Sequence, residues 1–187
     1  KMVDYKDLNT WVELTTLLER GKFDALFLAD VVGVYDVFNG SRDAAARSAT
    51  QLPVNDPMLL IPAMAHATEH LGFGFTSGML QYHPFTFARL ISTLDFLTSG
   101  RIAWNIVTSY LESAGRSYGL KGLPDHDERY EMADEYCDAV YKLWEASWAD
   151  DAVVKDIENR IYSDPTKIRD IVHEGKYYKV NGCHLTE

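Results

Sequence analysis

Three polar side chains of this sequence, Asp30, Thr76 and Asn105, lie in or directly after short apolar runs, where they could meet a ligand. A carboxylate, a hydroxyl and an amide together can hydrogen-bond a polar ring or a small polar molecule. Asn105 is the most informative, because an amide inside a buried segment needs hydrogen-bond partners. Each residue also has a structural explanation: Asp30 as a loop cap, Thr76 as a strand-end hydroxyl, and Asn105 as part of a buried polar layer.

A second candidate cluster combines an imidazole and a phenol. His126 and Tyr130 are four residues apart, so they share one face of the first turn of a predicted helix. The free backbone N–H groups of such a turn attract anions. The pair could therefore hydrogen-bond a phosphate or an oxygenated intermediate. The alternative is a helix-capping segment with a solvated histidine.

Residue spacing predicts neither a metal site nor an activated nucleophile. His66 and His70 flank a segment that reads His-Ala-Thr-Glu-His, which differs from the zinc-binding pattern His-Glu-x-x-His. We interpret it as a solvated helix end, where the helix dipole favours histidine. No nucleophile elbow is present, and neither Cys137 nor Cys183 has a base nearby in the sequence.

Periodicity places these residues on alternating elements. Helical periodicity marks four segments, and short, nearly continuous apolar runs mark three segments between them. The predicted helices cover residues 6–20, 56–70, 83–99 and 127–144, and the predicted strands cover residues 23–29, 72–77 and 102–108. Strict alternation of this kind predicts a parallel sheet that is buried on both faces.

The connecting segments favour a barrel over an open sheet. Long loops, residues 31–55 and 109–125, follow predicted strands, whereas short turns precede them. This asymmetry is typical of a (β/α)8 TIM-type barrel, whose site is built from the loops after the strands. The glycine-rich phosphate motifs of the usual nucleotide-binding open sheets are absent. Residues 149–164 are predicted to form an inserted loop with a short helix, and residues 172–183 a hairpin.

The length sets a limit on this interpretation. Three strands cannot close an eight-stranded barrel, which usually takes about 250 residues. The chain has 187 residues and does not begin with Met. We therefore expect residues 1–187 to form a single, incomplete domain, the N-terminal half of a barrel with loop insertions.

Composition excludes several classes of partner. The net charge is −10 with no block of Lys and Arg, which argues against nucleic acid and anionic membrane surfaces. No apolar run approaches the ~18 residues of a membrane helix. The first residues lack the apolar core of a secretion signal. Cys137 and Cys183 form neither a metal-type nor a redox-type pair, so we expect free thiols in the cytoplasm.

Four stretches resemble the bacterial luciferase-like flavin monooxygenases. Three of them are residues 17–30 (LLERGKFDALFLAD), 93–101 (TLDFLTSGR) and 104–109 (WNIVTS). The fourth, residues 126–135 with HDERY and ADE, is similar to the branch that contains nitrilotriacetate monooxygenase component A and dibenzothiophene-sulfone monooxygenase. The resemblance covers nearly the whole chain. It implies the (β/α)8 barrel, without its first strand and its C-terminal half.

The resemblance also implies a reaction and a site. Members use reduced FMN (FMNH2) from a separate NADH:flavin oxidoreductase, and reduced FMN reacts with O2 to a C4a-peroxyflavin that oxygenates a small organic substrate. By position, the flavin contacts would be Asp30, Thr76, His126 and Tyr130, with Asn105 against the isoalloxazine ring. His126 would also donate a hydrogen bond or a proton near the flavin. The phosphate-binding residues would lie in the missing half, and we expect a homo-oligomer.

Other functions remain open at this point. The same scaffold supports hydride transfer with a deazaflavin, and it could serve in a non-catalytic flavin-binding protein. The chain could also be a truncated product that has lost its function. The substrate is not implied by the residues, although the loop of residues 31–55 is a candidate lid over it.

Overall fold

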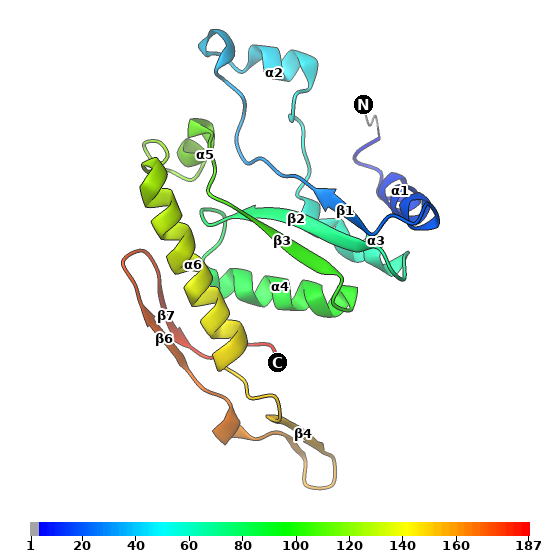
Figure 1. Cartoon of the computed structure of the whole chain (residues 1–187), viewed down its shortest axis with the longest axis vertical. Coiled ribbons are helices and arrows are strands. Elements are labelled where there is room, and N and C mark those ends of the chain that lie inside the picture. Colours follow the sequence, from blue (N-terminus) through cyan, green and yellow to red (C-terminus); the bar gives the residue numbers. More distant parts are fainter. Residues whose placement is uncertain (1–3) are drawn as a thin grey trace. The chain divides into compact units, whose positions relative to one another are not determined.

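The computed structural model describes residues 4–187. The chain groups into two compact units, Lys1–Gln81 with Leu94–Asp125, and Tyr82–Thr93 with His126–Glu187. Helix α4 (Pro84–Thr98) contributes to both units. Figure 1 shows the elements of each unit along the chain. Each unit is described below by itself.

A three-stranded parallel sheet forms the centre of the first unit, as the sequence predicts. Its order is β1 (Ala25–Leu28), β2 (Gly72–Gly78) and β3 (Ile102–Val107). Leu28 is in register with Phe75, and Thr76 is in register with Asn105. Because the strands are parallel, their carboxyl ends meet at one edge, and the residues that follow them gather there.

Two elements of this unit begin at aspartate caps. Helix α1 (Leu8–Arg20) begins after Asp7, whose carboxylate accepts from the Asn9 N–H at 3.0 Å. Asp56 caps the 3₁₀ turn η2 (Pro57–Leu59) in the same way, and helix α3 (Ile61–His66) follows.

Helix α3 ends four residues before its predicted end at residue 70. The reason is a carboxylate on helix α1. Glu19 Oε1 accepts from the backbone N–H groups of Glu69, His70 and Leu71 at 2.6 to 3.0 Å. These three N–H groups therefore bond Glu19 instead of helix carbonyls, and β2 begins directly after them.

The long loops after β1 and β3 contain more helix than the sequence predicts. The loop of residues 31–55 holds η1 (Phe38–Gly40) and α2 (Asp43–Ser48). The loop after β3 holds the short helix α5 (Glu112–Ser117), which sequence periodicity does not reveal.

The prediction that all strands are buried on both faces is correct only for β2. Phe73 and Phe75 of β2 are at most 1% exposed, whereas Phe27 of β1 is 58% exposed. Strand β1 pairs with β2 alone among the described residues. Two leucines of helix α4, Leu90 and Leu97, are also exposed.

The second unit is built on helix α6 (His126–Ala146). Its buried face contains Ala133, Tyr136, Ala139, Val140 and Leu143. Strands β6 (Ile171–Glu174) and β7 (Lys179–Gly182) form the antiparallel hairpin that the sequence predicts.

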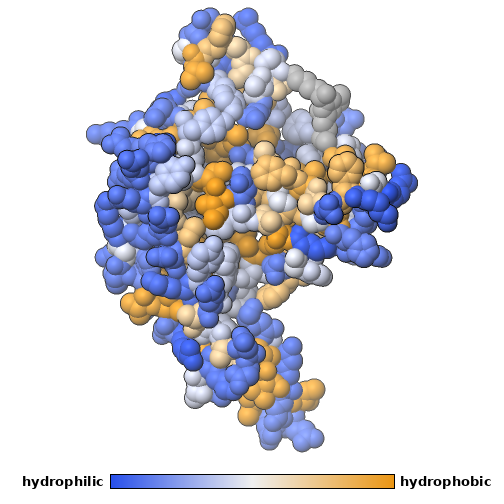
Figure 2. All heavy atoms as spheres, in the orientation of Figure 1, coloured by the Kyte–Doolittle hydropathy of each residue, from blue (hydrophilic) through white to orange (hydrophobic). Residues whose placement is uncertain are grey.

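The prediction of an inserted loop with a short helix at residues 149–164 is wrong. Strands β4 (Val153–Asp156) and β5 (Ile161–Ser163) form a second antiparallel hairpin there. The Asp156 carboxylate closes its turn by accepting from the Asn159 backbone and side-chain N–H groups. Apolar side chains of this hairpin, such as Ile157, are exposed. Figure 2 shows apolar residues in orange at the surface. Within residues 4–187, no helix combines the length and the apolar character that crossing a membrane requires.

Candidate functional site

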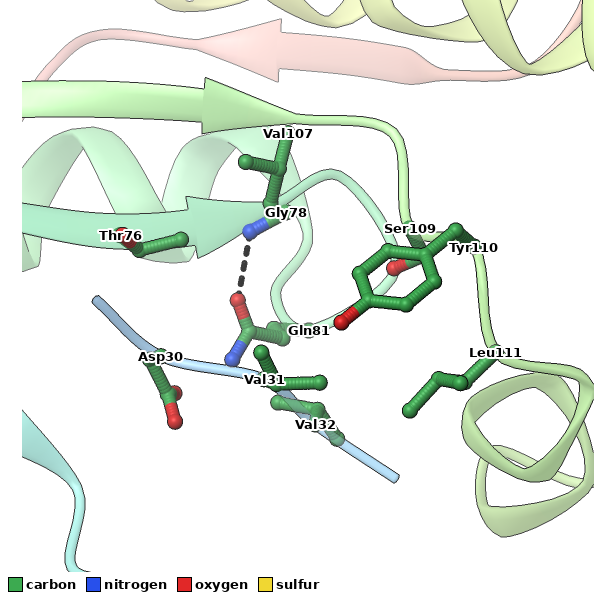
Figure 3. A pocket seen from close by; sticks show the side chains of 10 residues that line it. All are labelled: Asp30, Val31, Val32, Thr76, Gly78, Gln81, Val107, Ser109, Tyr110 and Leu111. Carbon is green, nitrogen blue, oxygen red and sulfur yellow. Dashed lines mark hydrogen bonds between the residues drawn. The ribbon is translucent and has the colours of Figure 1, made fainter. Parts of the chain in front are cut away.

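A small pocket opens at the carboxyl edge of the parallel sheet in the first unit, with a volume of about 70 Å³. It is lined by residues from β2, by the last residue of β3 and by the segments that follow all three strands (Figure 3). These residues are Asp30, Val31, Val32, Thr76, Gly78, Gln81, Val107, Ser109, Tyr110 and Leu111. The pocket thus combines apolar walls with a few polar groups, which is typical of ligand sites.

Asp30 supplies the only carboxylate among these lining residues. Burial raises its pKa, and repulsion from Asp56 raises it further. Hydrogen bonds from the Val31 backbone N–H and the Gln81 side chain oppose this shift. Asp30 is therefore a half-buried acceptor whose charge depends on its immediate partners.

Thr76 and Asn105 form one hydrogen-bonded chain across the sheet. The Asn105 amide donates to Thr76 Oγ1 at 3.1 Å, and the Thr76 hydroxyl donates to the Leu28 carbonyl at 3.2 Å. The structure therefore brings Thr76 and Asn105 together and gives both a role in joining the strand ends. Thr76 also lines the pocket, whereas Asn105 acts on it through Thr76.

Gln81, Ser109 and Tyr110 also line the pocket, although we did not predict them as site residues. The signal that could have revealed Gln81 is its place three residues after Gly78, where β2 ends. Tyr110 forms a hydroxyl–hydroxyl contact with Tyr35 of the loop after β1. This contact raises the pKa of Tyr110, and burial adds to the shift.

The loops after β1 and β3 are bonded to each other beside the pocket. Ser113 Oγ accepts from the Val34 N–H at 2.9 Å and donates to the Val34 carbonyl at 2.8 Å. Arg116 pairs with Asp36 at 2.5 Å. The position of the candidate lid is therefore set by the segment around helix α5.

Replacing Ser113 by alanine should loosen this connection, because the Val34 N–H and carbonyl both lose their partner. We expect backbone amides of residues 33–41 to exchange hydrogen about tenfold faster, corresponding to about 1.4 kcal/mol of lost hydrogen bonding. Ser117→Ala is the matched control, since the Ser117 hydroxyl donates to the Ser113 carbonyl within helix α5 and does not contact the loop after β1 among the described residues. Equal exchange rates in the Ser113 variant and the wild type would contradict the proposed connection.

His126 and Tyr130, the other predicted site residues, lie on the first turns of α6 in the second unit. Their ring centroids are 5.0 Å apart, as the four-residue spacing predicts. His126 Nδ1 contacts the Asp127 carboxylate at 2.9 Å. Tyr130 is 53% exposed. Both rings are therefore accessible to a ligand.

The donor set of the pocket suits a flat polar heterocycle better than a metal ion. Among residues 4–187, no group of three or more His, Cys, Asp or Glu side chains is arranged to hold a metal. Valine and leucine side chains of the pocket can cover a ring face, while Asp30 supplies a carboxylate among the lining residues. A carboxylate acceptor matches a ring that carries N–H groups.

Comparison with known proteins gives the family of the chain. Residues 2–187 match the family model described as luciferase-like monooxygenase. The long-chain alkane monooxygenase of Geobacillus thermodenitrificans (strain NG80-2) is 60% identical over 98% of this chain and 42% of its own length. The dimethyl-sulfide monooxygenase of Hyphomicrobium sulfonivorans is 55% identical over 98% of this chain and 38% of its own length.

The predicted branch is also confirmed. Nitrilotriacetate monooxygenase component A of Aminobacter aminovorans is 36% identical over 94% of this chain and 39% of its own length. Among solved structures, a riboflavin lyase with modified FMN and riboflavin is similar with a TM-score of 0.90 and 40% identity, covering 96% of this chain and 40% of that one. The chain therefore spans about two fifths of the length of these relatives.

Proposed function

The chain belongs to the luciferase-like monooxygenase family, and from this premise we propose that it is part of an FMNH2-dependent monooxygenase. In this proposal, its three parallel strands are completed to a (β/α)8 barrel by residues outside the chain. The complete protein would insert one atom of O2 into a small organic substrate. The observation that carries the proposal is the pocket at the carboxyl edge of the sheet, with the Asp30 carboxylate among apolar walls.

Reduced flavin, when bound, supplies the electrons that activate O2; the residues of this chain bind and orient it. Asp30 accepts a hydrogen bond from a ring N–H group, and Thr76 presents its hydroxyl beside it. Asn105 holds Thr76 in place through the bond between the two strands. The valine and leucine side chains of the pocket keep water away from the ring.

His126 and Tyr130 have separate roles in this proposal. Both rings are accessible, and both carry groups that donate hydrogen bonds. His126 hydrogen-bonds the flavin or holds a proton near its reacting edge. Tyr130 binds the cofactor from the next turn of the helix. The phosphate of the flavin would be bound by residues outside this chain.

The proposed enzyme is an oxygenase component that receives FMNH2 from a separate NADH:flavin oxidoreductase. The word component in the name of the nitrilotriacetate relative supports this arrangement. We propose a homo-oligomer in the cytoplasm, where Cys137 and Cys183 stay reduced, as the unbridged thiols of the structure suggest.

An anaerobic titration of the complete protein with FMNH2 tests the proposal. We expect binding by the wild type and about 100-fold weaker binding by Asp30→Ala, equal to about 2.7 kcal/mol. Asp138→Ala, an exposed carboxylate on α6, is the control and should bind like the wild type. With a flavin reductase and NADH, a candidate substrate should be oxygenated at the expense of O2.

Two outcomes would overturn the proposal. Binding of a reduced deazaflavin without binding of FMNH2 would show a hydride-transfer enzyme. Binding of FMNH2 without oxygenated product from any alkane, organic sulfide or amine tested would show a flavin-binding protein.

A further inference from the structure

The side chain of Gln81 connects the end of β2 with Asp30 in the pocket. The Gln81 backbone N–H donates to the Gly78 carbonyl at 3.1 Å and closes the turn after the strand. Gln81 Oε1 then accepts from the Ser77 hydroxyl at 2.9 Å and from the Gly78 N–H at 2.6 Å. Two donors thus occupy the amide oxygen of Gln81.

These two bonds determine which way the amide faces. A glutamine amide has one accepting oxygen and one donating nitrogen. Since the oxygen faces Ser77 and Gly78, the NH2 group faces the opposite side, where Asp30 lies (Figure 3). The Gln81 amide lies beside Asp30 in this view, and the Gln81 side chain lowers the pKa of Asp30 against the effect of burial. An inverted amide would place its NH2 group against the Ser77 hydroxyl and the Gly78 N–H, and the two N–H donors would repel.

Asp30 needs this partner because its surroundings disfavour its charge. Asp30 is half-buried, and Asp56, which precedes η2, carries the same charge. Tyr110, from the loop after β3, is the other titratable group that lines the pocket. No Lys, Arg or His side chain is among the ten lining residues. The compensation therefore comes from neutral donors, and Gln81 is the side chain that supplies one.

We propose that Gln81 is a positioning residue that keeps the Asp30 carboxylate ionised and directed at the pocket, so that Asp30 accepts a hydrogen bond from an N–H group of the bound ring. This inference rests on the proposed function and deepens it. It implies that the turn after β2, through Gln81 and Asp30, determines how the N–H edge of the bound cofactor is oriented. Gln81 itself acts through Asp30.

Leucine and glutamate at position 81 should affect the Asp30 carboxylate to different degrees. Leucine has a similar size but no donor, so the Asp30 carboxylate loses a partner. Glutamate can still accept from Ser77 and Gly78, but it places a second negative charge beside Asp30. Both changes favour the protonated form of Asp30, and glutamate does so more strongly.

The test is the pH dependence of FMNH2 binding by the complete protein. Binding should weaken at acid pH as Asp30 becomes protonated. The pH range in which binding is lost on acidification is the acid limb of the binding profile. In Gln81→Leu the acid limb should move to higher pH, and in Gln81→Glu it should move further. Near the acid limb, we expect Gln81→Leu to bind about tenfold more weakly than the wild type. Ser77→Ala removes one of the two donors that orient the amide, so a smaller shift in the same direction is expected.

A merely structural role would give a different result. General loosening of the pocket would weaken binding equally at every pH, with no movement of the acid limb. The Asp30→Asn background separates the two roles, because Gln81→Leu should add no pH-dependent effect where no carboxylate remains. An unmoved acid limb in Gln81→Leu, or a shift that persists in Asp30→Asn, would overturn the inference.

A second measurement does not depend on flavin binding. Carbon-13 NMR of labelled aspartate follows the ionisation of the Asp30 carboxyl directly, with Asp30→Asn identifying the signal. We expect Gln81→Leu to raise this pKa in the protein alone. If the wild type does not bind FMNH2 but this shift is seen, the proposed function fails while the role of Gln81 stands. An unchanged pKa would overturn the role of Gln81 whatever the cofactor.

Discussion

Replacing Arg101 by alanine should lower the free energy of unfolding by about 4 kcal/mol. The Arg101 guanidinium donates to the carbonyls of Ala65 at 2.7 Å and Leu71 at 3.1 Å, and Nε donates to the Thr98 carbonyl at 2.9 Å. It also donates to Thr68 Oγ1 at 3.0 Å. One side chain thus satisfies carbonyl groups in α3, at the start of β2 and at the end of α4. Urea denaturation of the complete protein measures the loss.

Arg101→Lys is the informative companion variant. It keeps the charge, but a single ammonium group cannot reproduce the planar fork that reaches several acceptors at once. We expect it to recover less than half of the loss in Arg101→Ala. Recovery of wild-type stability by lysine would show that charge alone matters, and a loss below about 1 kcal/mol in Arg101→Ala would contradict the proposed role.

The sequence predicted the parallel sheet well because its signals are local. Apolar runs, the caps at Asp56 and Gly21, and the alternation with helices all depend on residues close in the chain. The bond from Glu19 to residues 69–71 joins segments 50 or more positions apart, so the early end of α3 was not predictable. The β4–β5 hairpin was also missed, although the turn that the Asp156 side chain closes is local in the chain.

The candidate site was partly predictable for the same reason. Asp30 and Thr76 follow from the rule that residues after parallel strands meet at one edge, and both line the pocket. Asn105 was expected to need hydrogen-bond partners, and its amide donates to Thr76. Gln81 was not predicted, because its importance depends on the direction in which its amide is held. That direction is determined by Ser77 and Gly78 in three dimensions.

Strand-end residues and family resemblance contributed different parts of the proposal. The residues of the first unit build a pocket with one carboxylate, but several polar rings could satisfy it. The resemblance specifies flavin, and the sequence comparison establishes the family. The direction of the Gln81 amide adds what neither supplies: a reason why Asp30 stays an acceptor in a partly apolar pocket.

In the second unit, Gly175→Ala should lower the free energy of unfolding by about 3 kcal/mol. An alanine Cβ at this position would overlap Glu135 Oε1, so the carboxylate would have to move away. Glu135 accepts from the N–H groups of Lys176, Tyr177 and Tyr178 at 2.7 to 2.9 Å, and these bonds hold the β6–β7 turn to α6. Urea denaturation followed by tryptophan fluorescence measures the loss, since Trp144 and Trp148 lie in this unit.

A pH series and a double-mutant cycle with Glu135→Ala test whether the stability loss in Gly175→Ala arises from the Glu135 carboxylate. Burial raises the pKa of Glu135, but the N–H groups of Tyr178 and Tyr177 outweigh it, so the pKa is lowered. A carboxyl group with a lowered folded-state pKa stabilises the protein above its unfolded-state pKa, about 4.3, and this stability is lost as the pH falls through the folded value. The difference between wild type and Gly175→Ala should therefore shrink in acid. Glu135→Ala should lose about as much as Gly175→Ala, and the double variant should lose little more. Additive losses would show that Gly175 acts through something other than the Glu135 carboxylate.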